Sequence, residues 1–120
     1  MITSKYFKES EFQKCVPPCS LQNMQQSTMD MLDKAREIAG IPFVINSAYR
    51  TVEHEKRQGR DGTSSHTLGM AVDIRCNTSR NRFLIVKGLI FSGFDRIGYH
   101  PTFMHSDNSQ RHDKEVLFNY

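Results

Sequence analysis

The chain has 120 residues, of which 38% are hydrophobic and 24% are charged, and its formal net charge at pH 7 is +3. This length and balance indicate one globular domain and exclude a disordered chain, and no apolar run approaches the ~18 residues that a membrane span needs. Lysine and arginine residues are dispersed from Lys5 to Lys114, so we expect neither a membrane nor a nucleic acid as the partner.

The three cysteines, Cys15, Cys19 and Cys76, are an odd number, which argues against a disulfide framework. Cys15 and Cys19 flank Val-Pro-Pro, and no second pair of Cys or His residues stands at zinc-finger spacing. Two small thiols around a stiff turn are therefore favoured over a metal or redox pair. The segment Met1–Lys5 lacks a charged region followed by an apolar stretch, so no secretory signal is expected.

Residues 1–19 are predicted to form an irregular N-terminal arm with one helical turn at Ser10–Lys14, and residues 20–120 to form the core. Ser20 is a suitable N-cap for a helix over Leu21–Ala39, because apolar residues recur there at helical spacing. The methionines in this stretch are interpreted as core packing.

The middle of the chain alternates strand and loop signals. Phe43–Ser47 is short, apolar and rich in β-branched residues, which predicts a strand. Thr51 is predicted to cap a helical turn, and Gly59–Ser65 has loop composition. A second strand is expected over Met70–Arg75, with Asp73 on one face and the aliphatic residues between on the other.

A second long helix is predicted over Arg80–Phe91, capped by Thr78 or Ser79 and ended by Gly93. Its apolar residues are expected to face inward: Phe83, Val86, Leu89 and Ile90. Three short strand candidates follow: Asp95–Tyr99, Thr102–Asp107 and Val116–Phe118. The order of these elements predicts an α+β domain, with helices packed on one small, mainly antiparallel sheet.

Three residues of metal-ligand type stand out, because His66 and Asp73 flank the turn at Gly69 and His105 follows in a later strand. Two imidazoles and one carboxylate suit a zinc ion that keeps an open position for water, and such an ion lowers the pKa of the water to about 7. From spacing alone a second interpretation stays open, in which these are a surface histidine, a strand-end cap and a strand histidine.

Three motifs occur in order: Ser47-Ala48-Tyr49-Arg50, then Ser64-x-His66-x-x-Gly69-x-Ala71-x-Asp73, then Met104-His105-Ser106-Asp107. In combination they resemble the zinc D-Ala-D-Ala carboxypeptidase family, which includes phage L-alanyl-D-glutamate endolysins and shares its metal site with the Hedgehog signalling domain. The opening Tyr6-Phe7-Lys8-Glu9-Ser10-Glu11-Phe12 resembles that of the short phage and prophage branch. The resemblance covers about residues 5–110.

The resemblance implies a role for each matching residue. His66, Asp73 and His105 match the ligands of one Zn²⁺ ion, and Arg50 matches the arginine that faces the substrate and polarises the scissile carbonyl. Ser64 matches a serine beside the ligand loop that hydrogen-bonds the substrate or the loop.

One departure concerns the general base. Members of the family carry a glutamate three residues before the last histidine ligand, where this chain has Thr102. Asp107 and His100 are the local candidates to take the proton, and Asp107 is preferred. Asp107 is also suited to orienting a ligand, and His100 to holding the oxyanion.

The resemblance implies a zinc metallopeptidase that hydrolyses peptidoglycan stem peptides, either as a D-Ala-D-Ala carboxypeptidase or as an endolysin-type endopeptidase. A monomer is favoured, and the lack of a signal fits a phage lysin that waits in the cytoplasm before it degrades the cell wall. Because of Thr102, a catalytically weak module that holds zinc and binds the wall stays open as the alternative.

Overall fold

A computed structural model describes residues 1–120. It contains α1 (Glu9–Gln13), η1 (Leu21–Asn23), α2 (Gln26–Ala39), β1 (Ile45–Ser47), α3 (Val52–Arg57), η2 (Ser65–Leu68), β2 (Ala71–Arg75), α4 (Ser79–Ser92), β3 (Arg96–Tyr99), β4 (Phe103–Asp107) and β5 (Val116–Asn119), where η denotes a 3-10 helix. The predicted α+β class is confirmed. No helix combines the length and the apolar character that crossing a membrane requires.

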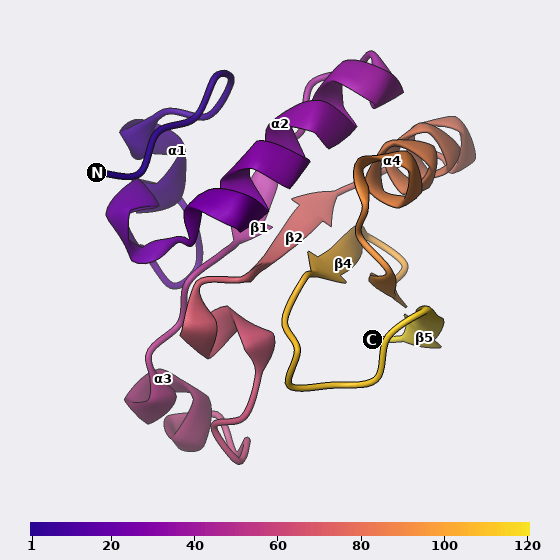
Figure 1. Cartoon of the computed structure of the whole chain (residues 1–120). Coiled ribbons are helices and arrows are strands. Elements are labelled where there is room, and N and C mark those ends of the chain that lie inside the picture. The colour runs from indigo at the N-terminus through magenta and orange to yellow at the C-terminus, as the bar shows by residue number, and fades with distance from the viewer.

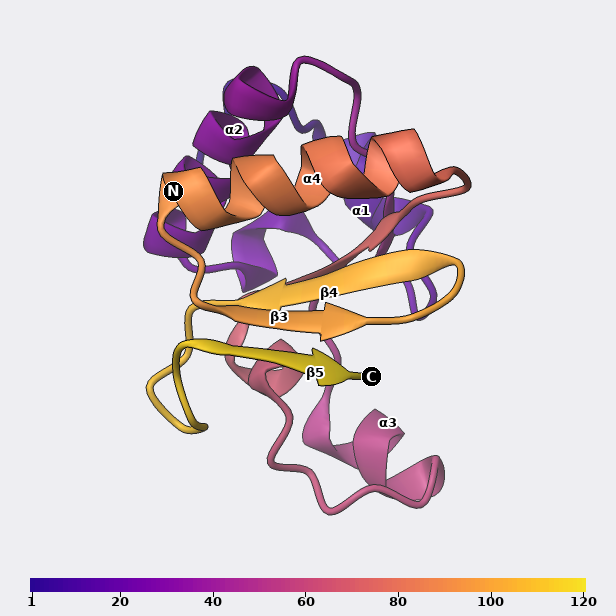
Figure 2. The same ribbon diagram turned by 90° about the vertical axis from the view of Figure 1, so that its right-hand side faces the viewer.

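The five strands form one sheet in the order β1-β2-β4-β3-β5. Every neighbouring pair is antiparallel except β3 and β5, which run parallel. The long helices α2 and α4 lie on one side of the sheet, and α3 lies on the other (Figures 1 and 2). The sheet therefore has one face covered by helices and one face that is available for a site.

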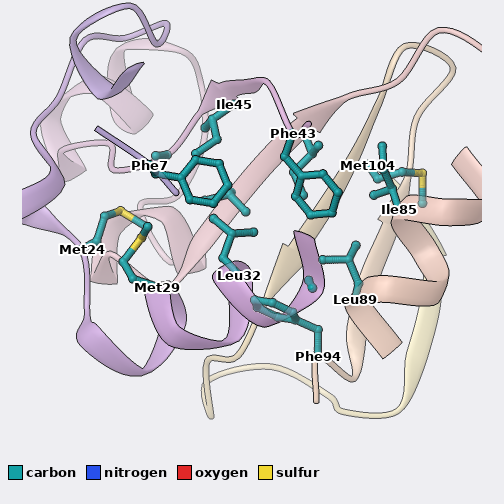
Figure 3. Close-up of a cluster of buried hydrophobic side chains, with 14 of the residues drawn as sticks. Phe7, Met24, Met29, Leu32, Phe43, Ile45, Ile85, Leu89, Phe94 and Met104 are labelled. Atoms are coloured by element: carbon teal, nitrogen blue, oxygen red, sulfur yellow. The ribbon is translucent and has the colours of Figure 1, made fainter. Parts of the chain in front are cut away.

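The hydrophobic core fills the space between the sheet and the two long helices (Figure 3). The N-terminal arm contributes Phe7 and Phe12, the sheet contributes Ile74 and Met104, and α4 contributes Leu89, and all of these are buried. Burial of one such side chain stabilises a fold by about 1.5–3 kcal/mol. The arm is thus part of the packing that holds β1 and β2 in place.

The first long helix begins later than predicted. Ser20 does act as an N-cap, but its hydroxyl caps the short helix η1 by accepting from the amide of Gln22. Met24 and Gln25 are extended, and the Gln25 amide donates to the carbonyl oxygen of Gly69 at 2.9 Å. The prediction of one helix from Leu21 is wrong, because a contact distant in sequence replaces a helical hydrogen bond.

The inward face of α4 also differs from the prediction. Leu89 is buried as expected, but Phe83 and Ile90 are 67% and 55% exposed. Gly88 sets the rotation of the helix, because a Cβ there would collide with the carbonyl oxygen of Ala35 in α2. Close approach of the two helices thus turns Gly88 inward, and Phe83 faces solvent as a result.

Gly69 sits where the ligand loop meets the start of α2, with φ of +70°. A Cβ at this position would collide with the backbone carbonyl of Asn23. We expect Gly69→Ala to reduce the free energy of unfolding, measured by urea denaturation, by clearly more than the ~1–2 kcal/mol of a left-handed residue alone. Gly40→Ala is the matched control, since Gly40 has φ of +72° with open space around it. Equal losses in the two variants would contradict the steric argument.

Candidate metal centre

Asp73 and His105 lie on the sheet face opposite the helical layer. Asp73 in β2 and His105 in β4 are direct partners in the antiparallel register. Because side chains alternate along a strand, their neighbours Ile74 and Met104 point into the core while these two polar groups share the other face. The distance from Asp73 Oδ1 to His105 Nδ1 is 3.0 Å.

His66 reaches the same point from η2. The hydroxyl of Ser64 accepts from the His66 amide and caps this short helix. His66 Nδ1 donates to the carbonyl oxygen of Ala48, so Nε2 carries the free lone pair. This Nε2 lies 3.3 Å from Asp73 Oδ1 and is buried without a hydrogen-bond partner.

The three groups fit a metal ion by their chemistry. One ligand atom each from His66, Asp73 and His105 lies within 4.8 Å of the others, and all three side chains are buried. A buried imidazole nitrogen that has a lone pair and no donor is costly unless a cation takes the place of the donor. The second interpretation, in which these residues are unrelated, is therefore not supported by the structure.

The protonation states also suit a divalent cation. Burial lowers the pKa of His66, despite the nearby Asp73, and keeps its ring neutral. Burial by itself raises the pKa of Asp73, but hydrogen bonds with His105 and His66 hold it well below its usual range. Burial likewise lowers the pKa of His105, but contacts with Asp107 and Asp73 raise it overall. Zinc requires the ionised carboxylate and the neutral imidazole seen here, and it would displace the proton that His105 retains.

His105 is oriented from behind by Asp107. His105 Nε2 donates to Asp107 Oδ2 at 2.6 Å, which turns Nδ1 toward Asp73. The Arg96 guanidinium approaches the same oxygen, at 3.2 Å from Nε, while Asp107 Oδ1 is buried and has no partner. This is the arrangement of a carboxylate that fixes the tautomer of a metal ligand.

Arg50 is brought to the same site and is nearly buried. Its Nε donates to Ser47 Oγ at 2.9 Å, and its Nη2 donates to Asp73 Oδ2, also at 2.9 Å. The guanidinium therefore holds the carboxylate of a candidate metal ligand, and Arg50 also lines the open cleft. Polarisation of a substrate carbonyl by Arg50 stays a prediction.

Glu55 is a residue of the site that the sequence did not reveal. It lies in α3 and is fully buried, with Oε1 3.6 Å from Arg50 Nη1 and Oε2 2.7 Å from Arg60 Nη1. A charged residue in a short polar helix is ordinarily a surface residue, so no local signal marked it. The carboxylate of Glu55 therefore lies between Arg50 and Arg60, which belongs to the loop after α3 and lines the cleft.

A cleft of about 530 Å³ opens beside the cluster, and of the three candidate ligands only His105 lines it. Its walls include Ser64, His100 and Asp107, which were predicted as site residues, and also His112, which was predicted to be a surface residue. His112 and Arg111 both bond the carbonyl oxygen of Thr63, so the loop after β4 is tied to the ligand loop.

Residues 5–107 match the family model described as Peptidase M15. The chain belongs to the Peptidase M15 family. This is a metallopeptidase family, so the match and the buried His-Asp-His cluster point to the same chemistry. The resemblance found in the sequence motifs is confirmed at this level. No curated protein matches the chain.

The matched part of this M15 peptidase ends before β5, yet aromatic residues in β5 and directly after it line the cleft. Phe118 and Tyr120 both line the cleft and both contact the ring of His105. The predicted strand Val116–Phe118 includes Phe118 but not Tyr120, and the sequence analysis assigned neither residue to the site. Only the tertiary structure shows that both rings contact His105.

Asp107→Asn tests how this M15 peptidase orients its last ligand. The amide keeps the shape of the carboxylate but loses its charge, so we expect zinc affinity to fall by about 10- to 100-fold. Metal titration against a competing chelator measures this, with Asp113→Asn as the control, since Asp113 is exposed in the loop before β5. Unchanged zinc affinity together with lost turnover would instead identify Asp107 as the general base.

Proposed function

We propose that this M15 family member is a zinc-dependent peptidase that hydrolyses peptidoglycan stem peptides, with one Zn²⁺ ion held by His66, Asp73 and His105. The observation that carries the proposal is the buried cluster of candidate ligands, of which His105 lines an open cleft. When bound, zinc supplies Lewis-acid chemistry and makes a water nucleophilic at neutral pH. A phage-type lysin that acts on the bacterial wall after its release is the setting that fits this activity.

The residues of the chain have separate tasks in this proposal. Arg50 places a fixed positive charge beside the carbonyl oxygen on which negative charge develops. Ser64 holds the ligand loop and offers a hydroxyl to the substrate. Asp107, through its unpartnered Oδ1, and His100 are the candidates to carry a proton to the departing amine.

The charges of the cleft favour an anionic peptide. Arg50, Arg60 and Arg96 line it, while its two carboxylates, Glu55 and Asp107, already face arginines. Together with a divalent ion, this leaves a net positive cleft, which raises the local concentration of a negatively charged substrate. Stem peptides carry free carboxylates, which supports both a D-Ala-D-Ala end and an internal bond of the cross-link as targets.

The test is digestion of purified peptidoglycan by the zinc-loaded protein, with mass spectrometry of the released fragments. New peptide products that vanish with chelator, and return on addition of zinc, would establish the peptidase and identify the bond. Products that persist in chelator would contradict a metal-dependent mechanism.

A zinc-holding module that binds the wall without cutting it is the second candidate. It is favoured by Thr102, which is exposed and whose hydroxyl contacts His100 Nδ1 at 3.3 Å, so this turn offers no carboxylate to the cleft. Stoichiometric zinc together with wall binding, and no products in the digestion, would select this candidate.

A further inference from the structure

The donors of Arg50 are largely used by its own chain. Nε and Nη2 donate to Ser47 and Asp73, and Nη1 faces Glu55. A guanidinium that is engaged in this way contributes charge to the cleft but has little free capacity to hydrogen-bond a substrate oxygen. A further hydrogen-bond donor on the open side of the candidate metal centre would add to the stabilisation of developing negative charge.

Tyr120 is in the right place to be that donor. Its ring stacks on the imidazole of His105, with centroids 4.4 Å apart and an interplanar angle of 14°. Tyr120 is 42% exposed and lines the cleft. A phenol keeps its proton at neutral pH and can donate it in a hydrogen bond, so the Tyr120 hydroxyl is a suitable donor to a ligand in the cleft.

The fold holds Tyr120 at this position by specific contacts. Gly98 in β3 pairs with His105 on one side and with Phe118 on the other. A Cβ on Gly98 would come within 3.0 Å of both the Phe118 ring and the Cβ of Tyr120, so a glycine is needed for the aromatic residues to cross over β3. The Tyr120 amide also donates to the carbonyl oxygen of Tyr99 at 2.7 Å.

We propose that Tyr120 is a catalytic residue of this protein, which donates a hydrogen bond from its phenol to the carbonyl oxygen of the scissile bond while its ring packs on His105. The inference rests on the proposed peptidase function and deepens it. It concerns a part of the chain beyond the residues matched to the family. The hydrogen bond from a neutral hydroxyl becomes stronger as negative charge develops on the carbonyl oxygen. It therefore stabilises the transition state more than the bound substrate.

Tyr120→Phe tests the hydroxyl, because phenylalanine keeps the ring that packs on His105. We expect zinc affinity and KM to stay within about twofold of wild type and kcat to fall by about 100-fold, as for loss of one oxyanion donor. Affinity for a phosphinate analogue of the cleaved peptide should fall in parallel with kcat. Tyr99→Phe is the matched control, since Tyr99 is 43% exposed and lies outside the cleft.

Each outcome decides the matter. A Tyr120→Phe protein that turns over like wild type overturns the role of Tyr120 and leaves the proposed peptidase standing. A parallel loss of zinc affinity and kcat overturns the donor role and makes Tyr120 a support of His105. A wild-type protein that binds zinc and releases no wall peptide overturns both proposals.

Discussion

Replacing His66 with alanine is expected to abolish stoichiometric zinc binding and all chelator-sensitive activity. His66 supplies a buried, neutral nitrogen that has no partner in the chain. The loss of affinity should exceed the roughly 10- to 100-fold that follows mutation of an outer partner of a ligand. Zinc content after dialysis and titration against a competing chelator measure the effect. The fold should persist without metal, because the core on the helical side of the sheet does not involve this residue.

His54→Ala is the matched control for His66→Ala. His54 lies in α3, outside the cleft, and it forms hydrogen bonds only through its backbone: its amide donates to Thr51 Oγ1 and its carbonyl oxygen accepts from the amide of Gln58. We expect this variant to bind zinc like wild type. Zinc retained at full stoichiometry by His66→Ala, with the chain folded, would mean that the ligand set is wrong.

Arg50→Ala is expected to have the second largest effect, because it acts on both stability and turnover. It leaves the carboxylate of Asp73 buried without a guanidinium, and it leaves Glu55 with Arg60 as its only arginine partner. Breaking a buried ion pair from one side costs about 3–5 kcal/mol, so thermal and urea unfolding of the zinc-free protein should shift by that amount. Turnover of the zinc-loaded protein should fall by roughly 2–4 kcal/mol in activation free energy.

Arg75→Ala separates the two effects from a general loss of charge. Arg75 lies on the same strand as Asp73 but is exposed, so its removal should leave both stability and turnover near wild type. If Arg50→Ala is destabilised but keeps wild-type turnover under zinc saturation, Arg50 only supports Asp73. If it is inactive but as stable as wild type, the ion pairs contribute nothing and the charge acts on the substrate alone.

The sequence predicted much of this fold because its signals are local. Alternation in the strand around Asp73 and the glycine that ends α4 each depend on a few neighbouring residues. The two errors, at Met24 and at Phe83, arise where backbones distant in the sequence come close to each other. At both points a glycine, Gly69 or Gly88, allows the approach, and no periodicity in the sequence shows which surface a glycine will meet.

The sequence by itself determined the α+β class and the family, and it predicted the three residues of the candidate metal site, since these depend on residue identity and spacing. Only the tertiary structure decided that Asp73 and His105 are paired across two strands and that Glu55 is buried behind Arg50. It also decided that Tyr120, the residue after β5, stacks on the ring of the candidate ligand His105. The physical reason is that sheet register and burial are set by contacts between distant segments, whereas ligand chemistry is carried by each side chain wherever it lies.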